Sequence, residues 1–233
     1  MNKKGTHVEV IISFVIFITF VVFLFVASKP AIIKQEDKTN LLDNLEYKIL
    51  EKEISADVKV ISVTISSVTG NCVNLGNFLE GQDIDGRVVV KNSSGDSVEA
   101  HMEGNSFSID SKDTFFKIYY SEEFDLIADS GATCTPATPN VGLVKNNRYV
   151  LEEKVYTSLN KEYEQLKEEL GVGGGEKIDF TYGIVLSNGT IIEKEHPELK
   201  SNISTSIYVR ETPIEYVNKD YEIVQGYLRT TIW

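Results

Sequence analysis

Hydrophobic and polar positions divide the chain into one long apolar run and a following region of mixed pattern. Positions 10–27 read VIISFVIFITFVVFLFVA, with only Ser13 and Thr19 as polar interruptions. Both hydroxyls can bond back to helix carbonyls, so neither prevents insertion into lipid. Such a helix rises about 27 Å, which is just enough for a hydrocarbon core. The pattern therefore predicts a transmembrane helix over 10–29.

The pattern after the apolar run predicts a break. Pro30 disfavours helical geometry at Lys29 and cannot donate a backbone hydrogen bond, so the helix is expected to end there. Residues 30–39 are interpreted as a linker. Leucine and isoleucine then recur at helical spacing over 41–50, with Asn40 as a possible N-cap. We expect this short helix to lie on the following domain or on the membrane surface.

From residue 57 onward the pattern favours strands. The β-branched run at 57–66 changes phase near Val60-Ile61, as a β-bulge would require. Turn residues separate further strand-like runs, which predicts hairpins between them. The expected pairs are 87–91 with 97–102, 106–110 with 114–120, 178–187 with 190–194, and 205–217 with 221–232. Residues 126–142 are predicted to form a long irregular loop, and Trp233 to be tied into the sheet.

One more helix is indicated in the second half of the chain. Apolar residues recur at spacings of three and four between 156 and 170, with Ser158 as a possible cap and Gly171 as the stop. Two heptads are too few for a coiled coil, so a helix packed across a sheet is favoured. The glycines of 171–175 lack a phosphate-loop pattern and are interpreted as a linker.

These elements predict an α+β protein. A single transmembrane helix precedes a mostly antiparallel, β-rich, sandwich-like domain over 40–233, with one or two short helices. The chain has 233 residues, 42% of them hydrophobic and 25% charged. This composition is ordinary for a globular protein and argues against a disordered stalk.

The charge of the chain disfavours one class of partner. The net charge is −12, and three lysines and one glutamate give the first thirty residues +2, so the remainder carries −14. Such a domain would repel a phosphate backbone. We therefore expect no nucleic-acid partner.

Topology follows from residues on the two sides of the apolar run. Lys3 and Lys4 lie close to its N-terminal end, which favours a cytoplasmic N-terminus and an extracellular C-terminal domain. Cys72 and Cys134 both fall in the external part, where one disulfide is the natural interpretation and two unpaired buried thiols are the alternative. Three glycosylation sequons lie there as well, at Asn92, Asn188 and Asn202.

Glu9 is the informative residue at the border of the apolar run, because a carboxylate at the edge of hydrocarbon is costly unless it is paired. Lys3-Lys4-Gly5, a few polar residues, Glu9 and an unbroken apolar helix together resemble the class III signal peptide of archaeal type IV pilin-like proteins. The resemblance implies a leader over 1–5 and cleavage between Gly5 and Thr6 by a prepilin-type peptidase. Glu9 would then pair with the N-terminus of a neighbouring subunit.

The chain departs from the pilin pattern at three points. Glu9 is the fourth residue after the implied cleavage point, where the fifth is usual, and the new N-terminus would be Thr6. Many filament-forming pilins also continue the anchor into a helical stalk, whereas Pro30 predicts a break. A plain membrane anchor and a cleaved secretory signal ending near Ser28 are the alternatives.

Catalytic patterns find little support. Of the two histidines in the domain, His101 and His196, neither belongs to a nucleophile or metal motif. Asp83-Ile-Asp85-Gly86 is a fragment of a calcium-loop pattern without its later ligands. We expect no enzyme activity, cofactor or metal. The resemblance implies a structural or adhesive subunit of a surface appendage that contacts membrane lipid and other pilin-like subunits. A solitary membrane-anchored binding module is the alternative.

Overall fold

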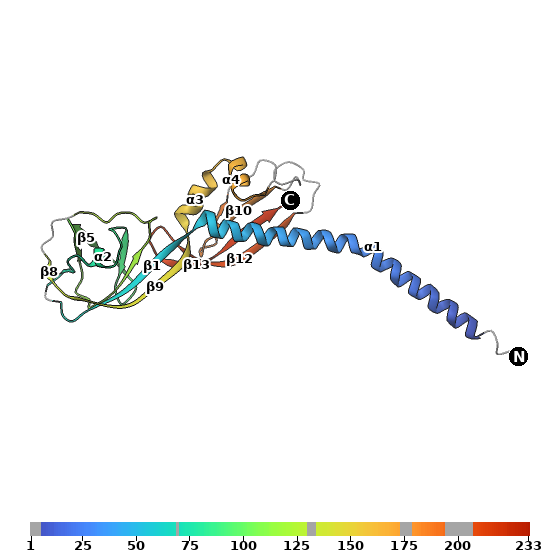
Figure 1. Ribbon diagram of the computed structural model, residues 1–233, viewed down its shortest axis with the longest axis horizontal. Coiled ribbons are helices and arrows are strands. Elements are labelled where there is room, and N and C mark those ends of the chain that lie inside the picture. Colours follow the sequence, from blue (N-terminus) through green and yellow to red (C-terminus); the bar gives the residue numbers. More distant parts are fainter. Residues whose placement is uncertain (1–5, 69, 130–133, 173–178, 194–206) are drawn as a thin grey trace.

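The computed structural model describes residues 6–68, 70–129, 134–172, 179–193 and 207–233. Within the N-terminal helix it describes the side chains of 9–27 and from 39 onward. Figure 1 shows a long helix at one end and a β-rich region at the other. The apolar helix and the mostly antiparallel β-rich domain with few helices are as the sequence predicted.

Helix α1 spans Thr6–Lys48, so the predicted break at Pro30 and the linker over 30–39 are wrong. A bend along the ribbon of α1 is visible in Figure 1, and a proline inside a helix is a known cause of such bends. Asn40 lies within α1 and caps nothing. The predicted amphipathic helix is the last part of α1, and it continues into the π-helical turn η1 (Ile49–Ile54).

The strands form two sheets. The larger sheet has the order β11 (Ile191–Glu193), β10 (Phe180–Val185), β13 (Ile223–Ile232), β12 (Tyr208–Val217), β9 (Pro139–Leu151), β1 (Ser55–Ile65), β7 (Phe115–Tyr120), β3 (Val88–Lys91) and β4 (Ser97–Val98). The smaller one has the order β5 (Ala100–Glu103), β6 (Ser106–Ile109), β2 (Val73–Asn74) and β8 (Thr135–Pro136). Among the described strands, only β9–β12 and β2–β8 pair in parallel.

Three predicted pairings are present. Strand β3 pairs with β4, β10 with β11, and β12 with β13, each antiparallel. The register of β1 against β9 shifts between Ile61 and Val63, next to the predicted bulge. Trp233 is buried, and its backbone N–H and C=O both bond to Asp179, so the C-terminus is tied into the sheet.

Other pairings differ from the prediction because the chain changes sheets. The run 97–102 is divided at Glu99 into β4 of the larger sheet and β5 of the smaller one. Strand β6 pairs with β5 and β2, whereas β7 pairs with β1 and β3, so β6 and β7 are not a hairpin. They belong to opposite layers of a sandwich, and Phe107 of β6 and Phe116 of β7 are buried in one core.

The region 126–142 is more ordered than predicted, because β8 and the start of β9 lie in it. The helix predicted over 156–170 is two helices, α3 (Glu152–Asn160) and α4 (Tyr163–Glu169), separated where Lys161 takes an extended backbone. Ser158 lies inside α3 and is not a cap. The glycine linker lies mostly outside the described residues, but Gly171 does end α4 with a positive φ of 62°.

Two main hydrophobic cores lie along the larger sheet. One core fills the sandwich between β1, β3 and β7 on one side and the smaller sheet on the other, beside the short helix α2 (Phe78–Gly81). We call this part of the molecule the distal lobe. The other core lies between β10, β12, β13 and the helices α1, α3 and α4, and we call this part the proximal lobe. The long strands β1 and β9 connect the two lobes, as Figure 1 shows.

Candidate functional site

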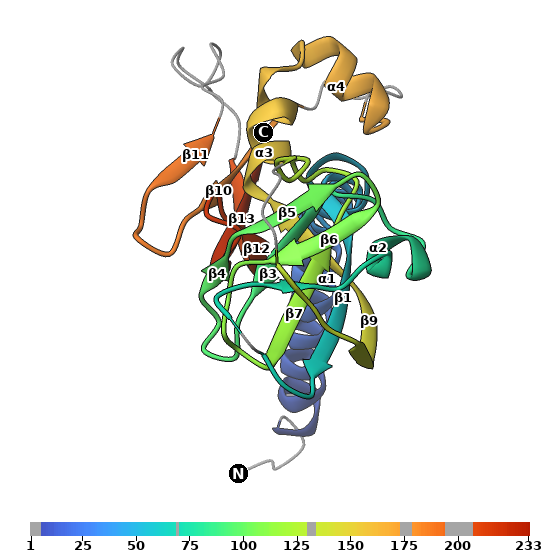
Figure 2. The ribbon, with the colours of Figure 1, turned by 90° about the vertical axis from the view of Figure 1, so that its left-hand side faces the viewer.

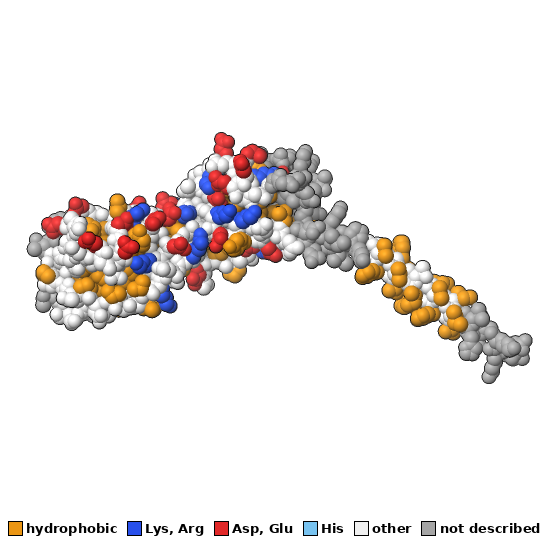
Figure 3. All heavy atoms as spheres, viewed as in Figure 1, with side chains coloured by type: hydrophobic (Ala, Val, Ile, Leu, Met, Phe, Trp, Pro, Cys, Tyr) orange, Lys and Arg blue, Asp and Glu red, His pale blue; other side chains and the backbone are white. Residues whose placement is uncertain are grey.

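The N-terminal part of α1 is an exposed apolar surface. Its span Glu9–Ala27 is long and apolar enough to cross a membrane, and none of it is buried. Its large hydrophobic side chains are 43–67% exposed, and Figure 3 shows them projecting beyond the rest of the molecule. A helix that is apolar on every face is stable only inside other apolar material. This segment therefore needs lipid or other helices around it.

The polar groups within this segment are compatible with a lipid environment. The Thr19 hydroxyl donates a hydrogen bond to the Val15 carbonyl at 2.7 Å, as the sequence predicted for such a residue. Glu9 lies in the first turn of α1 with its side chain exposed. A carboxylate at a helix N-terminus is stabilised by the helix dipole. Thr6 begins α1, and Gly5 lies outside the described residues.

The C-terminal part of α1 is held firmly by the proximal lobe. Leu42 and Leu45 of α1, and Ile49 at the start of η1, are buried in its core. The Lys48 ammonium donates a hydrogen bond to the Leu170 carbonyl at 2.7 Å, which joins α1 to the end of α4. Orientation of the domain is therefore coupled to the direction of the helix.

Two arginines hold the same junction from the sheet. Arg210 of β12 forms ion pairs with Asp43 and Glu46 on α1. Arg148 of β9 lies 3.6 Å from Glu51 of η1. The sequence analysis missed all of these contacts, because the partners are 97 and more residues apart and no local pattern connects them.

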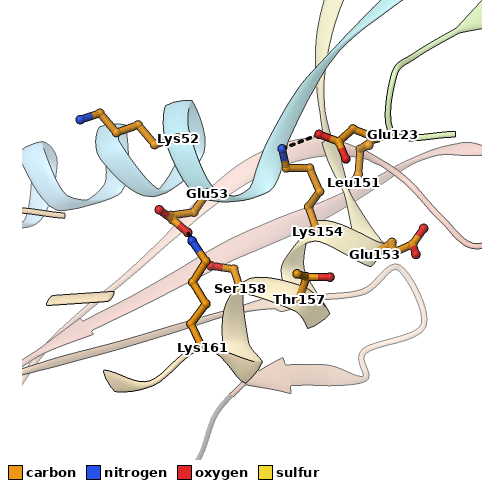
Figure 4. A pocket seen from close by; sticks show the side chains of 9 residues that line it. All are labelled: Lys52, Glu53, Glu123, Leu151, Glu153, Lys154, Thr157, Ser158 and Lys161. Atoms are coloured by element: carbon orange, nitrogen blue, oxygen red, sulfur yellow. Dashed lines mark hydrogen bonds and ion pairs between the residues drawn. The ribbon is translucent and has the colours of Figure 1, made fainter. Parts of the chain in front are cut away.

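A buried polar network lies directly beneath η1, beside a cavity of about 320 Å³ that Figure 4 shows. Ser158 donates a hydrogen bond to Glu53 at 2.9 Å and lies 2.5 Å from the Tyr182 hydroxyl. Lys161 pairs with Glu53 and with Glu169, both at 2.7 Å. The cavity itself is open and lined by both lysines and glutamates.

The protonation states of Lys161 and Tyr182 follow from their surroundings in this network. Although burial opposes it, hydrogen bonds to Glu169 and Glu53 raise the pKa of Lys161, which therefore stays protonated and is no general base. Burial raises the pKa of Tyr182, so its hydroxyl stays neutral. Neither group can activate the Ser158 hydroxyl as a nucleophile. The network joins η1, α3 and β10 and thereby fixes the base of α1.

The cysteines form the predicted disulfide. Cys72 and Cys134 are bonded, with Cα atoms 5.1 Å apart and a sequence separation of 62. The bond joins the turn around β2 to the segment that enters β8, as expected for a tie between the two loops. It lies in the distal lobe.

The sequons occupy different settings. The Asn92 side chain at the β3–β4 turn accepts hydrogen bonds from the backbone N–H of Ser94 and Asp96, both at 3.0 Å. Asn188 at the β10–β11 turn is exposed and accepts one from Thr190. Asn202 lies outside the described residues. Both described sequons are at hairpin tips, but Asn92 is half-buried and its Nδ2 atom also donates a hydrogen bond to Asp96, whereas Asn188 is exposed.

The remaining described candidate residues lie in the distal lobe. Arg87 forms a two-pronged ion pair with Asp85 and lowers the pKa of that carboxyl through the hydrogen bonds it donates. Asp85 of the calcium-loop fragment is therefore paired with a cationic side chain. His196 lies outside the described residues. His101 lies 3.1 Å from Asp110 in the distal lobe, a contact that the sequence analysis did not anticipate.

Comparison with known proteins leaves the site to be interpreted from its own geometry. No family model, no curated protein and no solved structure matches the chain.

Proposed function

We propose that the chain is a pilin-like subunit, or minor subunit, of an archaeal cell-surface appendage. In this proposal the N-terminus is cytoplasmic, the apolar part of α1 first spans the membrane, and the acidic β-rich domain is extracellular. The role of the subunit is structural or adhesive. The sequence resemblance around Gly5 and Glu9 motivates the proposal, and the shape of α1 supports it.

The observation that carries the proposal is the continuity of α1 from Thr6 to Lys48. A break at Pro30 would have separated the membrane segment from the domain by a linker and removed the likeness to a pilin stalk. Instead one helix has a bare apolar span at Glu9–Ala27 and packs Leu42 and Leu45, near its other end, in the domain. A helical stalk that carries a β-rich head is compatible with the bundling of helices into a filament.

The assembly step follows from the charges at the helix start. Removal of residues 1–5 would leave a positive amine at Thr6, one helical turn before Glu9. In the apolar centre of a helix bundle an unpaired carboxylate is costly, so Glu9 of one subunit pairs with the amine of the next. The apolar faces then bury one another, and the fixed junction at Lys48 and Arg210 sets the domains on the outside.

Mass spectrometry of the N-terminus of the native protein tests the leader. We expect a chain that starts at Thr6. An intact Met1 would favour the solitary membrane-anchored module, and a chain that starts after Ser28 would make the protein a secreted one and overturn the proposal.

A second experiment tests assembly. In the native host, Glu9→Gln should abolish filaments or incorporation into them, seen by electron microscopy of sheared surface material with labelled antibody. Thr19→Val is the matched control, because it also removes one polar group from the exposed apolar segment yet leaves the carboxylate in place. Equal incorporation of the two variants would remove the role assigned to Glu9.

A further inference from the structure

Three metal-ligating side chains come together on the β5–β6 hairpin of the distal lobe. Glu99, His101 and Asp110 each offer one ligand atom, and the three atoms lie within 4.8 Å of one another. Figure 2 looks onto the end of the molecule that carries β5 and β6, opposite the apolar helix. This cluster plays no part in the proposed assembly through α1.

The register of the hairpin creates the cluster. His101 of β5 is paired with Ser108 of β6, and beyond the paired strands the Asp110 N–H donates a hydrogen bond to the Glu99 carbonyl at 2.9 Å. Glu99 and Asp110 are therefore cross-strand neighbours, and His101 lies two residues along the strand from Glu99, on the same face. Like charges directly opposite each other destabilise a hairpin unless a cation lies between them.

The His101 imidazole is half-buried and brings its Nε2 atom to Asp110. The His101 side chain is only 18% exposed, and its Nδ1 atom is buried without a hydrogen-bond partner among the described residues. The Nε2 atom lies 3.1 Å from Asp110 Oδ2. Two ligands about 2.1 Å from a tetrahedral ion are separated by roughly 3.4 Å, so this pair is close to the spacing of a metal-bound one.

We propose that Glu99, His101 and Asp110 bind one divalent ion of the zinc class, through His101 Nε2 and one oxygen of each carboxylate. An imidazole with two carboxylates suits Zn²⁺ and its transition-metal neighbours, whereas Ca²⁺ takes oxygen ligands only. Glu99 is exposed and has the freedom to close the remaining distance. Three protein ligands leave a coordination position open on the solvent side, at the end of the molecule farthest from the apolar helix.

The test is titration of the full-length protein, purified in detergent and freed of metal by a chelator, with ZnCl₂ in a calorimeter. We expect saturable binding of one ion per chain that depends on this cluster. Loss of an outer-shell partner lowers metal affinity about 10–100-fold. His101→Gln removes a direct ligand, so it should lower the affinity for Zn²⁺ by more than that. Glu99→Gln should also weaken it.

Glu103→Gln is the matched control, because Glu103 lies two residues beyond His101 on the same strand, is exposed and is outside the cluster. Asp110 is left intact, since its other oxygen lies 4.0 Å from Cys134 Sγ and a change there could disturb the disulfide. Non-reducing gel mobility and circular dichroism check that each variant is folded.

Three results would overturn the proposal. One is the absence of saturable Zn²⁺ binding. The second is Zn²⁺ binding that is unchanged in the His101→Gln variant, which would place the ion at another histidine. The third is a preference for Ca²⁺ over Zn²⁺ when CaCl₂ is titrated in the same way.

Discussion

Ser158 of α3 donates a hydrogen bond to the buried carboxylate of Glu53 in η1, across 105 residues of sequence. Glu53 is 7% exposed and also pairs with Lys161 at 2.7 Å. These bonds allow a charged residue to lie at the point where the long helix enters the domain. A buried charge is tolerated only when its lone pairs are satisfied, so the helix is fixed to α3 at this point.

Ser158→Ala should therefore destabilise the protein by about 1–3 kcal/mol, the cost of leaving a buried polar group unsatisfied. The midpoint of urea unfolding, followed by circular dichroism, measures this. Thr157→Ala is the matched control, since Thr157 is the exposed neighbour on the same helix. An equal midpoint for the two variants would show that the Ser158–Glu53 bond contributes nothing.

One buried and one half-buried tyrosine predict a loss of stability at alkaline pH. Burial raises the pKa of both Tyr182 and Tyr163 above the ordinary value, while an unfolded tyrosine ionises near pH 10. The unfolded state thus releases protons first, so the stabilisation is complete below about pH 10 and declines as pH rises toward the folded pKa. Each such tyrosine should contribute a slope on the order of 1 kcal/mol per pH unit.

Chemical unfolding at a series of alkaline pH values, with tyrosinate absorbance recorded in parallel, measures that decline. Tyr182→Phe should make the slope shallower, whereas Tyr227→Phe, at an exposed position, is the matched control. A slope that Tyr182→Phe leaves unchanged would contradict the assignment.

Local patterns were sufficient where the chain pairs with its immediate neighbours. The Asn188-Gly189 turn and the run that ends at Trp233 gave the correct hairpins, because turn chemistry and side-chain alternation fix such pairs within a short stretch. The disulfide was also predicted, because only two cysteines occur. The apolar span was evident from its length alone.

Local patterns failed where tertiary contacts outweigh them. A proline costs about 3 kcal/mol in a helix interior, which favoured a break at Pro30. However, an apolar helix has no other way to satisfy its backbone in lipid, and Leu45 and Ile49 hold the later turns in the core. Strand β9 was missed in the same way, since its proline, glycine and asparagines are poor strand formers that only pairing with β1 keeps extended.

The junction between α1 and the proximal lobe can be tested by removing one of its buried side chains. Leu45 is 1% exposed within the core, so Leu45→Ala should cost about 2–5 kcal/mol of unfolding free energy. Asn44→Ala, at the exposed neighbouring position, should change it by less than about 0.5 kcal/mol. Urea unfolding of the full chain in detergent provides both values. Comparable costs for the two variants would mean that α1 does not pack on the domain in solution.

Loss of the disulfide should destabilise the distal lobe while leaving the junction intact. Cys72 and Cys134 close a loop with a sequence separation of 62, for which the chain-entropy relation gives about 4 kcal/mol at 25 °C. The variant Cys72→Ser/Cys134→Ser should therefore lose about that much unfolding free energy, and the midpoint of its urea unfolding should be lower. The double substitution is preferred to a single one, which would leave a thiol free to form bonds between molecules.

Hydrogen exchange then locates the effect. The loss of protection should be greater in β2, β6 and β8 than in β12 and β13, because only the former lie in the sheet that the disulfide ties together. Equal loss of protection in both lobes would instead show that the two cores unfold as one unit.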